Sequence, residues 1–184
     1  LILLTTAACG QTPEERKPVA SVDLIEPKGD CRPIRFEDSK FTHCIARPGE
    51  HKIVLRIKGG DGVLLRNLKS LANFMEEKPV SFAMNAGMYD MKSRPIGYYV
   101  EDGDRITKLN RAKGEGNFHM QPNGVFFGNE SGGWQVMTSS DFEAKVKDRP
   151  DFGTQSGPML LINGKVHPSI TENGESKYTR NAVG

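Results

Sequence analysis

Four polar clusters hold most of the side chains in this chain that could do chemistry. They combine glycine with amide, hydroxyl, carboxylate, imidazole or guanidinium groups, and they are residues 85–90, 114–124, 154–158 and 178–184. Such groups can grip an anion, hold hydroxyl groups and transfer protons. Glycine beside them lets a ligand or a second backbone approach closely. We therefore expect these separated segments to meet in one anion-attracting cleft.

Each cluster also has a purely structural explanation. Asn85 or Asn123 could satisfy backbone groups in turns. Gly87 and Gly157 could serve only to supply a positive φ. His119 could be a structural histidine, which is the more common use of a lone histidine. Only the joint occurrence of the clusters favours a functional site.

The elements that must position these clusters are mainly strands. Twenty glycines and eleven prolines indicate many turns. Alternating or apolar segments predict strands, which are 34–36, 41–46, 51–57, 80–84, 96–100, 105–109, 125–127, 134–137, 159–162 and 165–167. Turn residues at 102–103, 129–133 and 163–164 predict three hairpins. The 154–158 cluster is expected in a loop or at a strand end.

Two helices are expected beside this sheet. Apolar residues recur at helical spacing over Val63–Lys78, which predicts the main helix. Ser139 or Ser140 could cap a minor helix that runs through Lys147. The predicted fold class is α+β, with a mostly antiparallel or mixed, meandering sheet and one main and one minor helix packed on it.

Composition limits the class of protein. The 184 residues suffice for one domain with a real core, and 36% hydrophobic against 26% charged residues fits neither a membrane bundle nor a disordered chain. The net charge is +2, with basic and acidic residues interspersed. No basic stripe therefore points to nucleic acid as a partner.

The first residues resemble the end of a bacterial export signal. Residues 1–9 form an apolar run, small residues and then Cys9, which is typical of a truncated lipoprotein signal with Cys9 as the lipidated residue. A plain secretory signal with an incidental cysteine is the alternative, because Thr6 stands where such sites usually have leucine. Residues 10–30 are expected to be a polar tether, and 31–184 the domain. We expect an exported protein, periplasmic or on the outer surface, that meets the membrane only through a lipid anchor.

Export bears on the two remaining cysteines. Cys31 and Cys44 are an even pair that flanks two neighbouring short strands. In an oxidising compartment a disulfide between them is plausible, with two free buried thiols as the alternative. Neither cysteine has the spacing of a zinc ligand.

Together the clusters resemble one family. The segments FAMNAGMY (82–89) and PIGYYV (95–100) precede NFH (117–119) with PNGVFF (122–127), QSGPML (155–160) with NG (163–164), and RNAVG (180–184). Their order and rough spacing, from about Cys31 onward, resemble the phosphodiester glycosidases, whose domain is of the N-acetylglucosamine-1-phosphodiester alpha-N-acetylglucosaminidase type. Relatives continue to a further motif of the form L-D-G-G/S-x-S. If that motif supplies a catalytic aspartate, these 184 residues alone would be inactive.

The resemblance implies hydrolysis of sugar-1-phosphodiesters at the cell envelope. It assigns phosphate binding to Arg180 with backbone donors near Ser156 and Gly157, and sugar binding to amide groups. The implied substrate-binding residues are Asn85, Gly87, Asn123, Gln155, Ser156, Gly157 and Arg180. Asp90 or His119 would transfer the proton, with Glu115 as a less suitable second carboxylate. The alternative is a non-catalytic envelope lipoprotein that binds carbohydrate or phosphate.

The implied chemistry requires no cofactor. A Ca²⁺ or Mg²⁺ ion would be compatible with a phosphate site, and Asp90 would then be its carboxylate ligand. Nothing in the spacing of acidic residues demands such an ion. The implied partner is a small-molecule or polymeric sugar phosphodiester.

Overall fold

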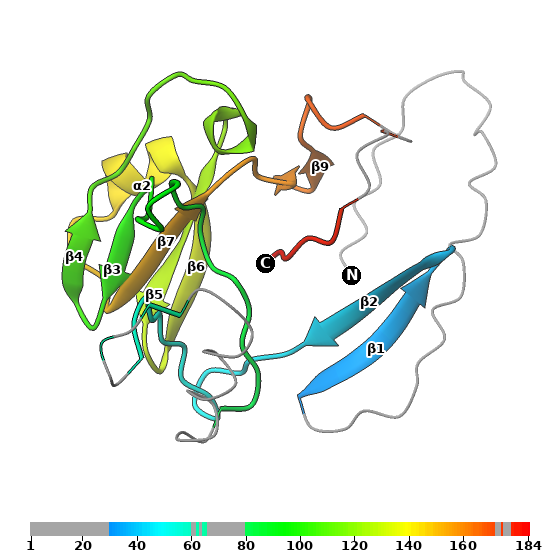
Figure 1. Cartoon of the computed structure of the whole chain (residues 1–184), viewed down its shortest axis with the longest axis horizontal. Coiled ribbons are helices and arrows are strands. Elements are labelled where there is room, and N and C mark those ends of the chain that lie inside the picture. Colours follow the sequence, from blue (N-terminus) through cyan, green and yellow to red (C-terminus); the bar gives the residue numbers. More distant parts are fainter. Residues whose placement is uncertain (1–29, 60–61, 63, 66–79, 172–173, 175–177) are drawn as a thin grey trace, which may run out of the picture. The chain divides into compact units, whose positions relative to one another are not determined.

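The structure is a computed structural model that describes residues 30–59, 62, 64–65, 80–171, 174 and 178–184. The chain divides into two compact units, Leu1–Cys44 and Ile45–Gly184, which we describe separately (Figure 1). The expected signal remnant with Cys9 and the tether, except for its last residue, lie outside the described residues. The same holds for the predicted main helix, apart from residues 64–65.

The described part of the first unit is one disulfide-linked hairpin. Strands β1 (Cys31–Phe36) and β2 (Ser39–Cys44) pair antiparallel, with Cys31 directly opposite Cys44. A disulfide joins these two cysteines. Both predicted strands and the predicted disulfide are therefore confirmed. A two-stranded hairpin is marginally stable alone, so closing this short loop covalently contributes about 3 kcal/mol in the chain-entropy model.

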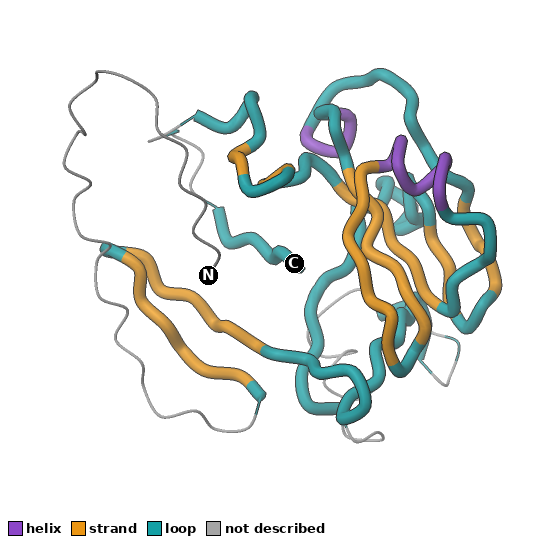
Figure 2. The backbone as a smooth tube through the Cα atoms, turned by 180° about the vertical axis from the view of Figure 1, so that it is seen from behind, coloured by secondary structure: helices purple, strands orange, loops and turns teal. Residues whose placement is uncertain are grey.

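The second unit is built on a five-stranded antiparallel sheet (Figures 1 and 2). Its strand order is β4-β3-β7-β5-β6. The strands are β3 (Tyr99–Glu101), β4 (Asp104–Thr107), β5 (Gly124–Asn129), β6 (Gly132–Thr138) and β7 (Phe152–Ser156). A separate small hairpin follows, formed by β8 (Leu161–Ile162) and β9 (Lys165–Val166). The predicted antiparallel, hairpin-rich sheet is confirmed.

Turn chemistry explains two of the three confirmed hairpins of this unit. Asp102 and Gly103 have φ values of 52° and 77°, and Asn163 and Gly164 have 50° and 75°. Two consecutive positive φ values make the tight turn that matches strand twist, and Asp-Gly and Asn-Gly adopt it readily. The β5–β6 turn instead carries a register shift before Asn129. The local sequence therefore accounts for the Asp-Gly and Asn-Gly turns.

Strand β7 was not predicted, although it is the central strand of the sheet. It pairs with β3 on one side and β5 on the other. Four of its five residues are buried. Its sequence FGTQS therefore lacks the alternation of apolar and polar residues that marks a strand with one solvent-exposed face. Gly153 fits there because the Tyr98 ring lies 2.7 Å from where a Cβ atom would stand. The 154–158 cluster, predicted in a loop or at a strand end, therefore lies at the end of β7 and continues into the loop after Ser156.

Two apolar clusters cover the two faces of the sheet. One contains Tyr98, Val100, Val125, Phe127 and Phe142. The other contains Leu55, Tyr99 and Phe152, with Ile53 and Ile57 packed against it. Because β7 lies between these clusters, it is enclosed on both faces.

Two predicted strands are wrong. Residues 51–57 do place Ile53 and Leu55 toward the core, but the backbone N–H of Ile53 donates to the Glu130 carbonyl and that of Ile57 to the Glu101 carboxylate. Alternation reports which side is apolar, whereas a strand also needs a ladder partner. Residues 80–84 are irregular, with Met84 45% exposed.

The described residues contain one α-helix, α2 (Ser139–Lys145), and one 3₁₀ turn, η1 (Asn117–His119). Of the two expected helices, only the region of the minor one lies within the described residues, and it contains α2. Thr138 is the N-cap of α2, in place of the expected serines, and its side chain accepts a hydrogen bond from the Asp141 N–H. Phe142 packs α2 onto the sheet, with ring centroids 4.8 Å from Tyr98. Within the described part of the chain, no helix is long and apolar enough to cross a membrane.

The disulfide yields a prediction about local stability. Replacing both Cys31 and Cys44 by serine should raise the rate of tryptic cleavage after Arg35 and Lys40 by at least about tenfold, because the hairpin then opens more often. Limited proteolysis followed by mass spectrometry measures this. Cleavage after Lys165, which lies in the other unit, is the internal control. Equal cleavage in variant and parent would show that the disulfide does not stabilise the hairpin.

Candidate functional site

Antiparallel pairing brings three of the four polar clusters to one end of the sheet. Ser156 at the end of β7 lies opposite Gly124 at the start of β5. Tyr99 at the start of β3 lies opposite Thr154. The segments that precede β3 and β5 and the segment that follows β7 therefore meet. These segments contain residues 85–97, 117–123 and 157–158.

The first segment lies against β7 through a close backbone contact. The Gly87 N–H donates to Thr154 Oγ1 over 2.9 Å. A Cβ atom on Gly87 would come within 2.5 Å of the Gln155 carbonyl oxygen. Glycine is therefore required at this position because the two backbones approach closely, and not because the residue has a positive φ.

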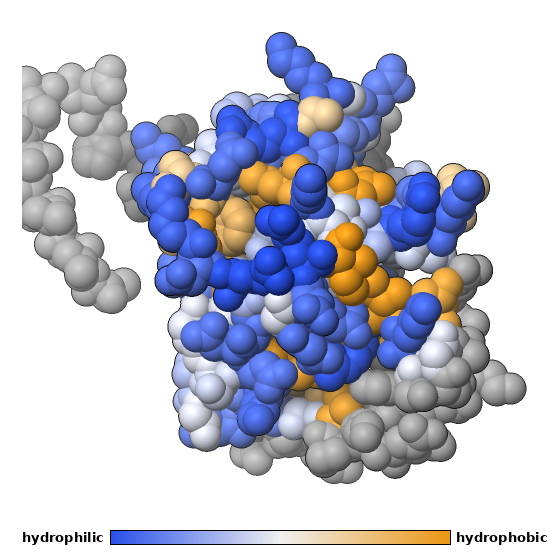
Figure 3. Space-filling view, turned by 90° about the vertical axis from the view of Figure 1, so that its left-hand side faces the viewer, coloured by the Kyte–Doolittle hydropathy of each residue, from blue (hydrophilic) through white to orange (hydrophobic). Residues whose placement is uncertain are grey.

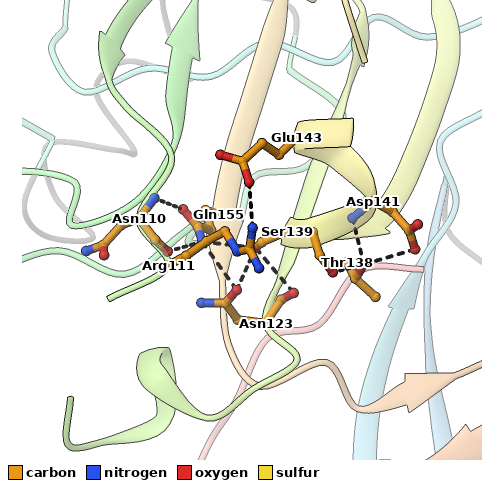
Figure 4. A network of polar contacts seen from close by, with 9 residues as sticks. Asn110, Arg111, Asn123, Thr138, Ser139, Asp141, Glu143 and Gln155 are labelled. Carbon is orange, nitrogen blue, oxygen red and sulfur yellow. Dashed lines mark hydrogen bonds and ion pairs between the residues drawn. The ribbon is translucent and has the colours of Figure 1, made fainter. Parts of the chain in front are cut away.

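Gln155 is the hub of this end of the sheet, and it is 1% exposed. Its Oε1 accepts the backbone N–H groups of Tyr98 and Asn110 over 2.9 and 3.0 Å. Its Nε2 donates to the Asn110 carbonyl over 2.7 Å and to Ser139 Oγ over 3.0 Å (Figure 4). The two N–H donors facing Oε1 fix the orientation of the amide. One side chain thus joins β7, the start of β3, the end of the β4 segment and α2.

Asn123 extends the network and is fully buried. Its Nδ2 donates to the Phe118 carbonyl over 2.9 Å, and its Oδ1 accepts the Ser139 hydroxyl over 2.5 Å. Asn123 and Gln155 were predicted to bind sugar hydroxyls directly. Their burial and internal bonding oppose direct contact in this arrangement, so we treat both as positioning residues.

Gly157 seals the contact between β7 and η1. A Cβ atom on it would lie 2.6 Å from the Phe118 carbonyl oxygen and 3.0 Å from the Asn123 side chain. Its role is therefore tight packing, since its φ lies outside the positive region. Ser156, one residue earlier, is exposed. It is the first side chain of β7 that reaches solvent at this end.

His119 has an orientation that suits proton transfer. Its Nδ1 lies 2.8 Å from the Ala112 carbonyl oxygen. A carbonyl can only accept, so Nδ1 carries the hydrogen in the neutral ring and Nε2 keeps its lone pair. Gly114 lies against the ring, where a Cβ atom would come within 2.9 Å of Nε2. The half-buried ring is thus held by its backbone surroundings.

Asp90 is bonded within its own loop. Its Oδ1 accepts the N–H groups of Lys92 and Arg94, and its Oδ2 accepts the Arg94 guanidinium over 2.6 and 2.8 Å. These hydrogen bonds, led by that from the Arg94 side chain, lower the pKa of Asp90 to about 2. Asp90 is therefore a carboxylate at working pH and cannot be a general acid. This geometry gives it a structural role.

The remaining candidates are exposed. Asn85 precedes Gly87 by two residues and is exposed. The Arg180 guanidinium lies over the Tyr178 ring, 5.6 Å from its centroid. The meeting of the fourth cluster with the other three stays a prediction. Among the described residues, no group of three or more His, Cys, Asp or Glu side chains could hold a metal ion.

Sequence reasoning missed several residues that shape this end of the sheet. Asn110 binds Gln155 through its backbone and donates from Nδ2 to the Ile96 carbonyl over 2.8 Å. Gly97 lies where a Cβ atom would be 2.7 Å from Gln155 Oε1. Buried His167 lies with Nε2 3.0 Å from the Gln121 carbonyl. Of these residues, only Gly97 could have been found from the sequence, because it lies in the segment PIGYYV (95–100) that carries the family resemblance.

Gln155 gives the first prediction from this site. Gln155→Leu should lower the free energy of unfolding by about 3 kcal/mol or more, because it leaves buried donors at Tyr98 and Asn110 without acceptors. Chemical denaturation measures the loss. Gln135→Leu on exposed β6 is the matched control and should change it by less than about 0.5 kcal/mol. Similar values for both variants would contradict the hub role.

Asp90 gives the second prediction. Its carboxyl carbon should titrate in NMR spectra with a midpoint of about 2, and Arg94→Gln should move that midpoint toward 3.8. A depressed pKa in the folded state means that its contribution to stability is present above the ordinary value and is lost as the pH falls toward 2. Lys92→Gln is the control, because Lys92 meets Asp90 through its backbone N–H. A wild-type midpoint near 3.8 would contradict the bonding described.

Comparisons with known proteins agree with the motifs found here. A family model described as phosphodiester glycosidase matches residues 78–184. The chain is 40% identical over 116 residues to the uncharacterized protein YigE of Escherichia coli (strain K12), a match that covers 62% of this chain and 44% of that protein. The chain thus spans less than half the length of this relative. No solved structure matches. Because the family match extends over more than half of the sequence, the chain belongs to the phosphodiester glycosidase family.

Proposed function

We propose that this protein hydrolyses sugar-1-phosphodiesters at the bacterial cell envelope, releasing the sugar and leaving a phosphomonoester. The observation that carries the proposal is the convergence of residues 85–97, 117–123 and 155–158 at one end of the sheet. Family membership supplies the reaction class. The convergence supplies a rigid frame on which exposed polar groups can meet a substrate.

His119 is the proposed general base. Donation from Nδ1 to Ala112 leaves the Nε2 lone pair to accept a proton from water. The water oxygen then bonds to the anomeric carbon, and the bond from that carbon to the phosphate oxygen breaks. The phosphomonoester leaves with the electron pair. Because phosphate leaves more readily than an alcohol, the second carboxylic acid of ordinary glycosidases is less necessary.

The proposed substrate contacts come from exposed residues. Arg180 would grip two phosphate oxygens through its planar guanidinium. Ser156 would add its hydroxyl group, and Asn85 would bind sugar hydroxyls. Gly87, Gly157, Asn123 and Gln155 would act by holding these segments in place.

No cofactor is required by this mechanism. Were a Ca²⁺ or Mg²⁺ ion to bind, Asp90 would be the carboxylate nearest the converging segments, and hard oxygen ligands suit such ions. Its oxygens, however, are already bonded to Arg94 and to backbone N–H groups. An ion would have to displace these bonds.

A second candidate function is carbohydrate or phosphate binding without catalysis, by an envelope lipoprotein. It is favoured by the bonding of Asp90 to Arg94, which occupies one of the two groups proposed for proton transfer. The same exposed residues would then bind the ligand, and no proton acceptor would be needed.

The proposed location rests on the cysteines. The Cys31–Cys44 disulfide fits an oxidising compartment outside the cytosol. Lipidation of Cys9 would hold the protein at a membrane surface. One acyl chain binds membranes only marginally, so stable anchoring would need more than one.

Turnover of model substrates tests the function. The full-length protein should cleave a nitrophenyl sugar phosphodiester to nitrophenyl phosphate and the free sugar. It should leave the simple nitrophenyl glycoside intact. His119→Gln should lower kcat by about 10²–10⁴-fold, because the base is lost. Arg180→Ala should abolish turnover without unfolding the protein.

His43→Gln is the matched control, because His43 lies exposed on β2 of the other unit. It should leave kcat unchanged. Sugar phosphodiester binding without turnover would favour the non-catalytic function. Full activity in His119→Gln would exclude His119 as the base.

A further inference from the structure

A wide, open hollow lies on the α2 side of the sheet, beside the end where the motifs meet. Its volume is about 640 Å³, which is within the range of small-ligand sites. The turn between β3 and β4 lines one side, and the end of α2 with residues 146–149 lines another. Figure 3 looks onto this side of the molecule, where strongly hydrophilic residues lie directly beside hydrophobic ones.

The floor of the hollow is apolar and firmly packed. It is formed by Tyr98, Leu109, Phe142 and Val146. Tyr98 and Phe142 are each 6% exposed, with ring centroids 4.8 Å apart. The accessible part of this floor comes mainly from the half-buried Leu109 and Val146, and apolar side chains suit the C–H face of a sugar ring better than a hydrated ion.

The rim of the hollow is cationic. Arg105, Lys147 and Arg149 line it, and Arg149 donates to the Gly103 carbonyl over 3.3 Å. Within the described part of the chain, Arg105 and Lys147 form no ion pair. Of the two acidic lining residues, Glu143 is bonded to Arg111, and Asp148 lies between Lys147 and Arg149 in the chain. Three cations against two acidic residues, one of them already paired with Arg111, leave the rim with an excess of positive charge that can attract an anion.

The Tyr98 hydroxyl adds a polar group to this floor. It makes no hydrogen bond to any described residue. Burial raises the pKa of Tyr98, and the positive charges of Arg105 and Arg149 oppose that rise. Both guanidinium groups therefore contribute positive potential at the Tyr98 hydroxyl. A phosphate oxygen bound there could accept a hydrogen bond from the Tyr98 hydroxyl. The positive charges of the two arginines would attract the same phosphate group.

The hollow adjoins the candidate site through shared residues. The Tyr98 N–H donates to Gln155 Oε1, so Tyr98 belongs to both regions. Leu109 lines the hollow, while Asn110 binds Gln155. The Arg111–Glu143 ion pair lies beside the amide network in Figure 4, and Glu143 also lines the hollow. A ligand longer than one sugar unit could therefore bridge the two regions.

We propose that this hollow is an accessory subsite for an anionic sugar unit, so that the substrate is a polymer of phosphodiester-linked sugars. The apolar floor would hold the ring, and Arg105, Lys147 and Arg149 would hold its phosphate. This inference rests on the proposed function for the identity of the substrate. Its physical basis is the conjunction of an apolar floor with a rim on which Arg105, Lys147 and Arg149 outnumber Glu143 and Asp148.

Binding of a defined oligosaccharide tests the proposal. The probe is a fluorescein-labelled oligosaccharide of four sugar-1-phosphate units, and its anisotropy gives Kd with the full-length protein at low ionic strength. Arg105→Gln with Lys147→Gln should raise Kd by at least about tenfold, since two charge contacts are lost. Lys58→Gln with Lys165→Gln removes the same net charge elsewhere in the unit and should change Kd less than twofold.

Two further measurements separate this proposal from the proposed function. Turnover of the single-unit nitrophenyl phosphodiester should be the same in the Arg105/Lys147 variant as in the parent. An uncharged oligosaccharide of equal length should bind at least tenfold more weakly than the charged one.

If no sugar phosphodiester is turned over, the proposed function fails, and the contrast in Kd still decides the role of the hollow. Equal Kd values for the two double variants, or no binding of the charged oligosaccharide by the parent, would overturn the subsite.

Discussion

The side-chain amide of Gln155 is the constraint on which the rest of the second unit depends. This side chain extends from β7, the central strand. It bonds the N–H groups of Tyr98 and Asn110 and the carbonyl of Asn110, which have no partner in a strand ladder. It also reaches Ser139 at the start of α2. A buried polar network of this kind stabilises only when every member is bonded. The positions of the β3 entrance, the segment after β4 and α2 are therefore coupled through one residue.

The glycines of the motifs follow from this constraint. Gly87, Gly97 and Gly157 each lie where a Cβ atom would come within about 2.8 Å of a neighbour, and those neighbours belong to β7, η1 or Gln155 itself. Three chain segments can meet around a buried amide only if their backbones come this close. The glycine-rich character of the clusters is thus a packing requirement of the network. It does not by itself identify ligand contacts.

What the sequence could predict was local. Asp102-Gly103 and Asn163-Gly164 contain their own turn chemistry, so their hairpins were predicted correctly. Strand β7 could not be recognised, because burial on both faces removes alternation, and its partners are far away in the chain. The partners of Gln155 at Tyr98 and Asn110 lie 57 and 45 positions away, and no spacing rule connects them. Residue types were therefore identified at Asn123 and Gln155, while their roles as ligands were not supported.

The division between buried and exposed polar groups narrows the chemistry that this site can perform. Asn123 and Gln155 are used internally, and Asp90 is held as a carboxylate by Arg94. His119, at the edge of the same network, has Nδ1 bonded to the Ala112 carbonyl, so the neutral form of the ring carries its lone pair on Nε2. One base without a matching carboxylic acid would be a poor arrangement for an alcohol leaving group, which needs protonation. For a phosphate leaving group, which needs no protonation, the proposed base would suffice, and the proposed guanidinium and backbone donors would meet the leaving charge. A site with one proposed base and no carboxylic acid is therefore compatible with the phosphate leaving group that the family's reaction class implies.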